Sequence, residues 1–192
     1  MKSPARWNKK VAAARADNDF FPTDSDITHA FMTAETPRLR RLGAKTIQEP
    51  FCGDGAMARV IQKYAFNVQA SDLINRGYGR DGFNALDLDY KGAFIITNPA
   101  YKDDIPARFI EHAANTGAKY LAMVLKVQFW NPQEKPALWK RLRPEREYKI
   151  CWRPDFLGLG GGMTDVCVWV WDFSRIVRRT EVYLLTKDGR CI

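Results

Sequence analysis

Short apolar runs alternate with amphipathic segments along most of this chain. The runs predict strands over residues 45–49, 66–71, 85–89, 92–97, 119–126, 148–152, 166–173 and 181–186. Residues 55–64, 105–116 and part of 132–142 predict helices. A further helix is expected from about Thr23 to Leu42, with Thr23 and Asp26 as a capping box and Pro37 as an interruption. Strands that alternate with helices predict an α/β fold, whose sheet is mostly parallel with a late antiparallel strand and has helices on both faces.

The domain organisation expected from this pattern is simple. Residues 1–18 are basic and rich in alanine without an obvious buried face, and we interpret them as an N-terminal arm. Residues 19–192 are long enough for one domain and show no separate target-recognition domain. We find no internal repeat.

The composition indicates which binding partner and which cellular compartment to expect. The formal net charge is +8 and the pI is about 9.4, which favours an acidic partner, and nucleic acid is the commonest one. Many small soluble proteins are nevertheless basic without binding nucleic acid.

The four cysteines lack zinc-ligand spacing, which predicts reduced thiols and no metal site. The basic start has no signal-peptide h-region, so a cytoplasmic location is expected. The oligomeric state is not predicted.

A glycine-containing loop follows the first predicted strand. It spans residues 49–55 and contains neither the GxGxxG pattern of dinucleotide sites nor the GK[ST] pattern of phosphate loops. Carboxylates gather here instead, at Glu49, Asp54 and Asp72, and suit a cationic ligand that carries ribose hydroxyls. Asp72 ends the second strand about 20 residues later, where a ribose-binding acid is expected. Asp87 would lie near the end of the third strand. Each acid could alternatively cap a helix or face water.

A second short motif follows the apolar run 93–96. Thr97 precedes the sequence Asn98-Pro99-Ala100-Tyr101, about 45 residues after the glycine loop. The side-chain oxygen of Asn98 and the carbonyl of Pro99 could each accept one N–H of an aromatic amine and so align its lone pair. Tyr101 could stack on a base taken out of its helix. A structural Asn-Pro turn with a buried tyrosine is the alternative.

Together these motifs resemble class I S-adenosylmethionine-dependent methyltransferases, and most closely the compact, phage-type DNA adenine-N6 methyltransferases. Residues 49–55 resemble motif I of that family, Asp72 and Asp87 the acids of motifs II and III, and residues 98–101 the catalytic motif IV. Residues 20–23 resemble the Pro-Thr segment that packs against the methionine part of the cofactor. Ala100 departs from the family's second proline.

The resemblance implies a Rossmann-like fold, S-adenosylmethionine as cofactor, and base flipping. It implies that Asn98, Pro99 and Tyr101 are catalytic. It implies cofactor contacts for Phe21, Pro22, Thr23, Glu49, Pro50, Phe51, Gly53, Gly55, Asp72, Asp87 and Asn98.

Basic residues gather further along the chain. A nucleic-acid surface is predicted from Lys135, Lys140, Arg141, Arg143 and Arg153, with tryptophans 130, 139 and 152 interleaved among them. A solvated helix face with the tryptophans in the core is the alternative. The glycine-rich residues 158–162 would form a loop over the substrate or a plain hairpin turn.

The function expected from these observations is methylation of adenine N6 in DNA with little sequence specificity, in the host cytoplasm if the protein is phage-encoded. RNA adenine fits the charge and the motif equally. Cytosine N4 is less expected because those motifs more often begin with serine. Protein glutamine methyltransferases usually carry a larger helical domain ahead of the loop, whereas fewer than 50 residues precede it here. A catalytically inactive nucleic-acid-binding or partner-binding module is the remaining alternative.

Overall fold

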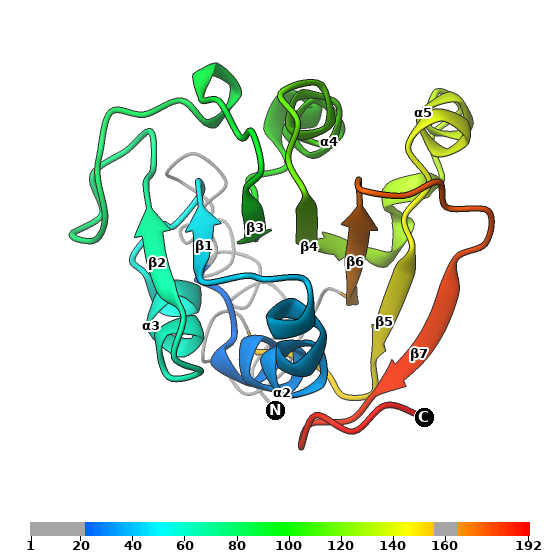
Figure 1. Cartoon of the computed structure of the whole chain (residues 1–192), viewed down its shortest axis with the longest axis horizontal. Helices are drawn as coiled ribbons and strands as arrows, with labels where there is room; N and C mark the ends of the chain where they lie inside the picture. The colour runs from blue at the N-terminus through cyan, green and yellow to red at the C-terminus, as the bar shows by residue number, and fades with distance from the viewer. Residues whose placement is uncertain (1–21, 156–164) are drawn as a thin grey trace, which may run out of the picture.

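The computed structural model describes residues 22–155 and 165–192, which build one seven-stranded sheet (Figure 1). The strands are β1 (Thr46–Glu49), β2 (Asn67–Ala70), β3 (Phe94–Thr97), β4 (Tyr120–Lys126), β5 (Arg146–Ile150), β6 (Val166–Asp172) and β7 (Glu181–Leu185). Their order is β2-β1-β3-β4-β6-β5-β7. Strand β6 runs antiparallel to both neighbours and every other pair is parallel, which confirms the predicted sheet.

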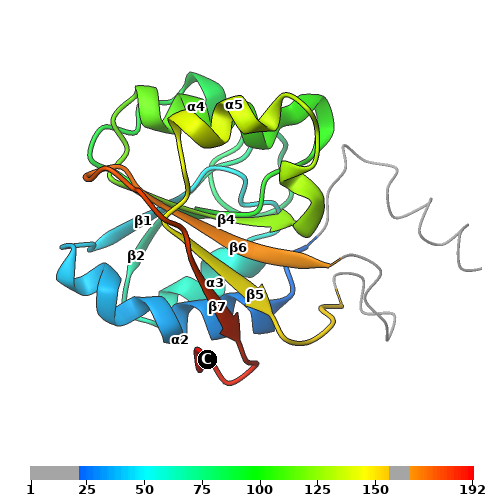
Figure 2. The same ribbon diagram turned by 90° about the vertical axis from the view of Figure 1, so that its right-hand side faces the viewer.

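Helices cover both faces of the sheet, as predicted (Figure 2). Helices α2 (Ser25–Arg41) and α3 (Ala56–Gln62) lie on one face, and α4 (Ile105–Asn115) and α5 (Lys135–Arg141) lie on the other. Three short 3-10 helices, η1 (Ala85–Asp87), η2 (Lys102–Asp104) and η3 (Val127–Trp130), lie in the connections. Each face has its own hydrophobic cluster, and the two clusters share the central strands between them.

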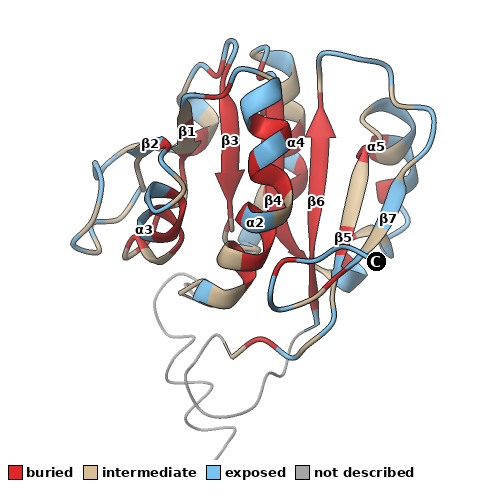
Figure 3. Ribbon diagram, turned by 60° about the horizontal axis from the view of Figure 1, so that its bottom comes forward, coloured by how far each residue is buried: buried red, intermediate tan, exposed pale blue. Residues whose placement is uncertain are grey.

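The central strands explain why this sheet is stable. Every residue of β6 is buried, as are all but the last of β4, and their red ribbons mark the middle of the molecule (Figure 3). Long apolar runs without polar alternation are what strands covered on both faces require. The sequence predicts both segments as strands, and their apolar residues explain why these strands lie in the centre of the sheet.

Two sequence predictions are wrong in detail. Residues 85–89 do not form a strand, because Asn84 accepts the Leu86 backbone N–H at 3.1 Å and begins the 3-10 helix η1. Pro37 does not interrupt α2. Its ring is on the exposed side of the helix, where the carbonyl that loses its partner can bind water.

The start of α2 also differs from the prediction. Asp24, not Thr23, caps the helix, and its Oδ1 accepts the Asp26 backbone N–H at 2.9 Å. This leaves the Thr23 side chain available for another partner.

Among the described residues, no helix is both long and apolar enough to cross a membrane.

Candidate active site

Two loops meet at the carboxyl edge of the sheet, where β1 and β3 lie side by side (Figure 1). The chain leaves β1 toward β2 on one side and returns to β3 on the other, so this edge is the topological switch point of the sheet. Open α/β sheets bind their ligands beyond the carboxyl ends of the strands at such a point. Residues 50–55 follow β1 and residues 98–101 follow β3, which brings the two sequence motifs together here.

The glycine loop is fixed by the carboxylate of Asp72. Its Oδ2 accepts the Gly53 backbone N–H at 2.8 Å, and its Oδ1 accepts the Ile74 backbone N–H at 3.0 Å. Gly53 and Gly55 have φ angles of 54° and 83°, in the region that favours glycine. Asp72 therefore lies beside the glycine loop, as the sequence predicts, and orders that loop.

Tyr78 lies directly against the glycine loop, a contact that was not predicted from the sequence. A Cβ atom on Gly55 would be 2.3 Å from the Tyr78 Cγ, and the Arg59 guanidinium lies 4.8 Å from the Tyr78 ring centroid. The segment after β2 thus folds back over the start of α3. Gly55 is required here for two reasons, its φ angle and the ring against it.

We expect Gly55→Ala to destabilise the protein substantially more than Gly77→Ala. Gly77 has an almost identical φ of 82°, but an added Cβ would meet nothing within 4 Å. Gly77→Ala should therefore report backbone strain alone, about 1–2 kcal/mol. Urea unfolding of both variants measures the difference between their losses of unfolding free energy. Removal of the Tyr78 ring in the Gly55→Ala/Tyr78→Ala double variant should reduce this difference. Equal losses in the two single variants would contradict the contact.

Glu49 ends β1 and is buried beneath the glycine loop. Only 2% of its surface is exposed, and its Oε2 has no hydrogen-bond partner among the residues that the structure describes. Burial raises the pKa of this carboxyl well above 4.5, and the charges of Asp54 and Asp72 raise it further, while the Ala58 backbone N–H opposes them. A buried carboxyl oxygen without a partner needs either a proton or a cationic ligand.

We expect Glu49→Gln to stabilise the ligand-free protein above pH 4.5, the ordinary pKa of this carboxyl. The folded state holds the Glu49 proton more tightly than the unfolded state does. The contribution of Glu49 to the free energy of unfolding is therefore fully present below its ordinary pKa. It is lost as the pH rises through the raised pKa of the folded state. Melting temperatures of both proteins from pH 4 to pH 8 measure this. The advantage of the variant should grow with pH, and a constant difference would contradict the assignment.

Asn98 is the first residue after β3 and is held by Thr23. Its Nδ2–H donates to Thr23 Oγ1 at 3.1 Å. Because the amide nitrogen is engaged, the Oδ1 of Asn98 remains as an acceptor for a ligand. The segment before α2 thus orients a residue 75 positions later. Sequence reasoning selected both residues and missed the bond between them.

Tyr101 lies along the end of β4. Its hydroxyl donates to the Val124 carbonyl at 3.3 Å, and its ring packs against the hydrophobic cluster on the α4 face. The Lys126 ammonium lies 4.3 Å from the ring centroid. Sequence reasoning did not select Lys126, although its place at the end of a predicted strand was a usable signal.

The backbone after Tyr101 is strained. Asp103 and Asp104 have φ angles of 52° and 53°, which residues other than glycine rarely adopt. The Asp104 carboxylate accepts two hydrogen bonds from the Lys135 ammonium, at 2.6 and 2.5 Å. Lys135 is 3% exposed, so its prediction as a nucleic-acid-binding residue is wrong. It binds the segment next to Tyr101 instead.

The other predicted nucleic-acid residues do not form one surface with the site. Arg141 pairs with Glu111, and Arg143 donates to the Arg178 carbonyl. Arg143 precedes β5 and Arg153 follows it, so they lie toward opposite edges of the sheet. Lys140 and Arg153 are exposed, and Arg153 is on the side of the site.

The tryptophans pack in the core, as the alternative to a nucleic-acid surface predicts. Trp130 packs edge to face with Trp139 at 4.7 Å and with Trp169 at 5.7 Å between ring centroids. This aromatic cluster belongs to the core on the α5 face. Trp152 packs against the cluster on the opposite face. The interleaving of tryptophan with basic residues in the sequence therefore reflects packing against the two hydrophobic clusters.

The remaining predicted cofactor residues have less direct roles. The Phe51 ring packs edge to face on Phe109 of α4, with 5.0 Å between centroids, and Pro50 is buried. Asp87 is exposed and accepts a hydrogen bond from Asn84 Nδ2 at 3.1 Å. Pro22 is half-buried ahead of Thr23. Phe21 and the loop 158–162 lie outside the described residues.

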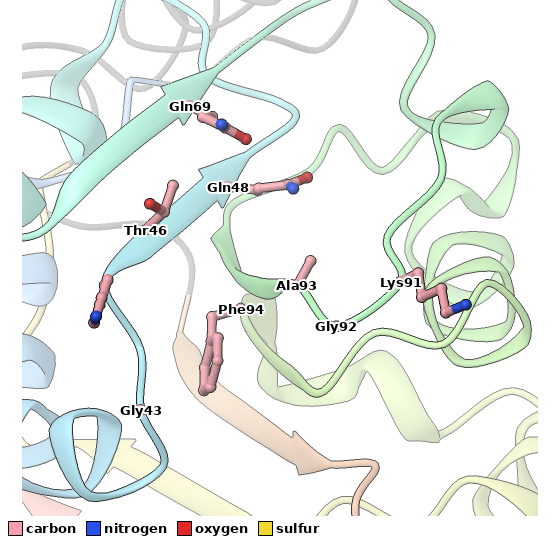
Figure 4. Close-up of a pocket in the computed structure, with 9 residues that line it drawn as sticks. Gly43, Thr46, Gln48, Gln69, Lys91, Gly92, Ala93 and Phe94 are labelled. Atoms are coloured by element: carbon pink, nitrogen blue, oxygen red, sulfur yellow. The ribbon is translucent and has the colours of Figure 1, made fainter.

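A shallow pocket of about 290 Å³ lies away from this site (Figure 4). It is found at the amino ends of β1 and β3, between Lys91, which precedes β3, and Phe94, which begins it. Gln48 and Gln69 line it from β1 and β2, on the sheet face that carries α4 and α5. Its position at the opposite edge separates it from the two motifs.

Comparison with solved structures identifies the fold. The methyltransferase subunit of a type I restriction-modification system from Streptococcus thermophilus superposes with a TM-score of 0.61, over 90% of this chain and 50% of its own, at 13% identity. A Pyrococcus horikoshii protein proposed to be an RNA methyltransferase superposes with a TM-score of 0.60, over 87% and 98%, at 10% identity. This chain has the methyltransferase fold. It spans half the length of the S. thermophilus subunit.

A third structure relates the methyltransferase fold to its cofactor. The magnesium protoporphyrin IX methyltransferase of Synechocystis, solved with bound S-adenosylmethionine, superposes with a TM-score of 0.51, over 77% of this chain and 79% of its own, at 14% identity. No protein-family profile matches the sequence, and no curated protein is significantly similar to it. At these identities the likeness establishes the fold.

Proposed function

We propose that this protein transfers a methyl group from S-adenosylmethionine to the N6 amine of adenine in DNA, with little sequence specificity. The orientation of Asn98 carries the proposal. Its amide nitrogen is engaged by Thr23, which leaves the oxygen to accept an amine N–H at the switch point of a methyltransferase fold. The motif order in the sequence supports the same reaction.

The residues present fit S-adenosylmethionine. The orphaned Glu49 oxygen suits the cofactor's ammonium group, and Asp72 beside the glycine loop suits its ribose hydroxyls. Pro22 and Thr23 precede α2 beside Asn98 and would pack against the methionine part. When bound, the cofactor supplies an electrophilic methyl group on its sulfonium. A cation beside Glu49 would lower its pKa.

The chain's own residues would prepare the amine. The lone pair of an aromatic exocyclic amine is delocalised into the ring, which makes the nitrogen a weak nucleophile. Asn98 Oδ1 and the Pro99 carbonyl would each accept one N–H and so direct the lone pair toward the methyl group. Neither group titrates, so their contribution is alignment and electrostatic preorganisation. Tyr101 would stack on the base once it has left its helix.

DNA is the proposed substrate because the net charge of +8 favours a polyanion, and the motif resembles that of DNA adenine methyltransferases. RNA adenine is the second candidate, since the charge and the Asn98 geometry fit it equally. The structural similarity to a protein proposed to be an RNA methyltransferase is consistent with this second candidate. Protein glutamine presents a similar amide nitrogen but lacks the polyanion that the charge favours.

Parallel incubation with DNA, RNA and protein tests the substrate. S-adenosylmethionine labelled in its methyl group is supplied to each, and the products are digested and separated. We expect N6-methyladenine in DNA. Label in RNA or protein alone would retain the methyltransferase activity and overturn the substrate. Label in none of the three, with cofactor binding intact, would favour an inactive binding module.

A further inference from the structure

Lys126 adds a positive charge to the candidate active site and was not among the residues predicted from the sequence. Lys126 is the last residue of β4, at the same carboxyl edge as Asn98, and its partner Val166 begins β6. Its ammonium lies 4.3 Å from the centroid of the Tyr101 ring, within cation–π range. The side chain is half-buried, so its long stem can still move.

The Tyr101 ring has limited room for another partner. One edge is tied to β4 through the hydroxyl bond to Val124, and the ring packs against the cluster on the α4 face. A base stacked on a ring lies about 3.5–4.0 Å from it. That is the layer in which the Lys126 ammonium now lies, so a base on this face and the ammonium exclude each other.

We propose that Lys126 occupies the stacking place of the target base and, when the base enters, moves its ammonium to a phosphate of the same nucleotide. The inference rests on the proposed function and deepens it, because it assigns the phosphodiester next to the target base as a part of what is recognised. No covalent step is involved. The lysine exchanges a cation–π contact for a charge-assisted contact, which is the stronger of the two.

This role differs from that of three of the predicted nucleic-acid-binding residues. Lys135 is buried against Asp104, Arg141 pairs with Glu111, and Arg143 is engaged by a backbone carbonyl. Lys126 lies against the proposed catalytic tyrosine, so its displacement is coupled to base entry itself. The coupling gives a basis for low sequence specificity, because every nucleotide brings both a base and a phosphate.

A double-mutant cycle between protein and substrate tests the inference. Wild-type and Lys126→Gln proteins methylate a single-stranded oligonucleotide with one adenine in a pyrimidine run. A second oligonucleotide carries neutral methylphosphonates on both sides of that adenine. Lys126→Gln should raise KM for the charged substrate roughly tenfold, and the neutral linkages should do the same to wild type. The two changes together should cost little more than one, since they remove the same contact.

Two further variants separate charge from structure. Lys126→Arg should recover most of the affinity, because it keeps the cation. Lys91→Gln, which removes an exposed lysine at the opposite edge of the sheet, should leave KM and kcat unchanged. The slope of log affinity against log salt should become less steep by about 0.7 in Lys126→Gln, the value for one phosphate contact on a single strand.

The results that would contradict the inference can be distinguished from those that would contradict the proposed function. If Lys126→Gln and the neutral linkages reduce activity independently, Lys126 does not bind that phosphate. A wild-type KM and salt slope in Lys126→Gln would overturn the inference while leaving the proposed function intact. If wild type methylates no nucleic acid, the proposed function fails first, and the inference fails with it.

Discussion

Asn98→Ala is expected to reduce methyl transfer by at least two orders of magnitude while S-adenosylmethionine still binds. The side-chain oxygen that would accept the amine N–H is lost, and removal of one preorganised hydrogen-bonding group at a reacting centre costs on the order of 100- to 1,000-fold in kcat. The residue follows β3 at an edge held by the sheet, so the fold should persist. Labelled methyl transfer together with cofactor titration measures the two effects separately.

Thr23→Val provides the matched comparison for Asn98. It removes the acceptor that holds the Asn98 amide nitrogen at 3.1 Å without changing side-chain volume greatly. We expect kcat to fall by roughly tenfold, because Asn98 keeps its oxygen but loses its fixed orientation. If Asn98→Ala retained more activity than Thr23→Val, the assignment of Asn98 as the amine acceptor would be wrong.

Glu35→Ala is expected to destabilise the protein by about 3–5 kcal/mol, the largest stability effect that we predict. Glu35 lies in α2, is fully buried and faces the sheet. Its Oε1 accepts from Arg146 at 2.8 Å and from the Tyr148 hydroxyl, and its Oε2 accepts from the Tyr120 hydroxyl at 3.0 Å. Without Glu35 these donors stay buried with too few partners.

The same carboxylate also pairs with Arg38, which reaches Glu145 and, at 3.1 Å, Asp172. The network thus joins α2 to the strands β4, β5 and β6. Glu111→Ala is the matched control, because Glu111 pairs with Arg141 on the surface, where both side chains are largely exposed. Its loss should be at most about 1 kcal/mol. Equal losses for the two variants in urea unfolding would contradict the role of Glu35.

The sequence predicts most of this fold because its signals are local. Residues 120–125 and 166–171 are continuous apolar runs, as strands that are covered on both faces require. The prediction fails where a single hydrogen bond decides the conformation. Asn84 converts residues 85–87 into a 3-10 helix, and solvent on one side of α2 tolerates Pro37. Neither effect has a period that could be read from the sequence.

The candidate site is predictable in its parts but not in its contacts. The two motifs show where Glu49, Asp72 and Asn98 lie, because loops after parallel strands meet at one edge. Tyr78 against Gly55 and Thr23 with Asn98 depend on how distant segments return, which no local pattern encodes. Basic charge misled the prediction at Lys135, since a lysine that is buried against Asp104 cannot be told from a surface lysine in the sequence.

Binding of S-adenosylmethionine is the central claim, because every proposed role of Asn98, Tyr101 and Lys126 depends on a methyl donor at the switch point. Calorimetric titration of the wild-type protein, with Asp72→Ala alongside, tests it most directly. We predict one site per chain in wild type and a loss of binding in Asp72→Ala, which removes both the proposed ribose acceptor and the Gly53 contact. Absence of binding by folded wild-type protein would contradict the proposed site.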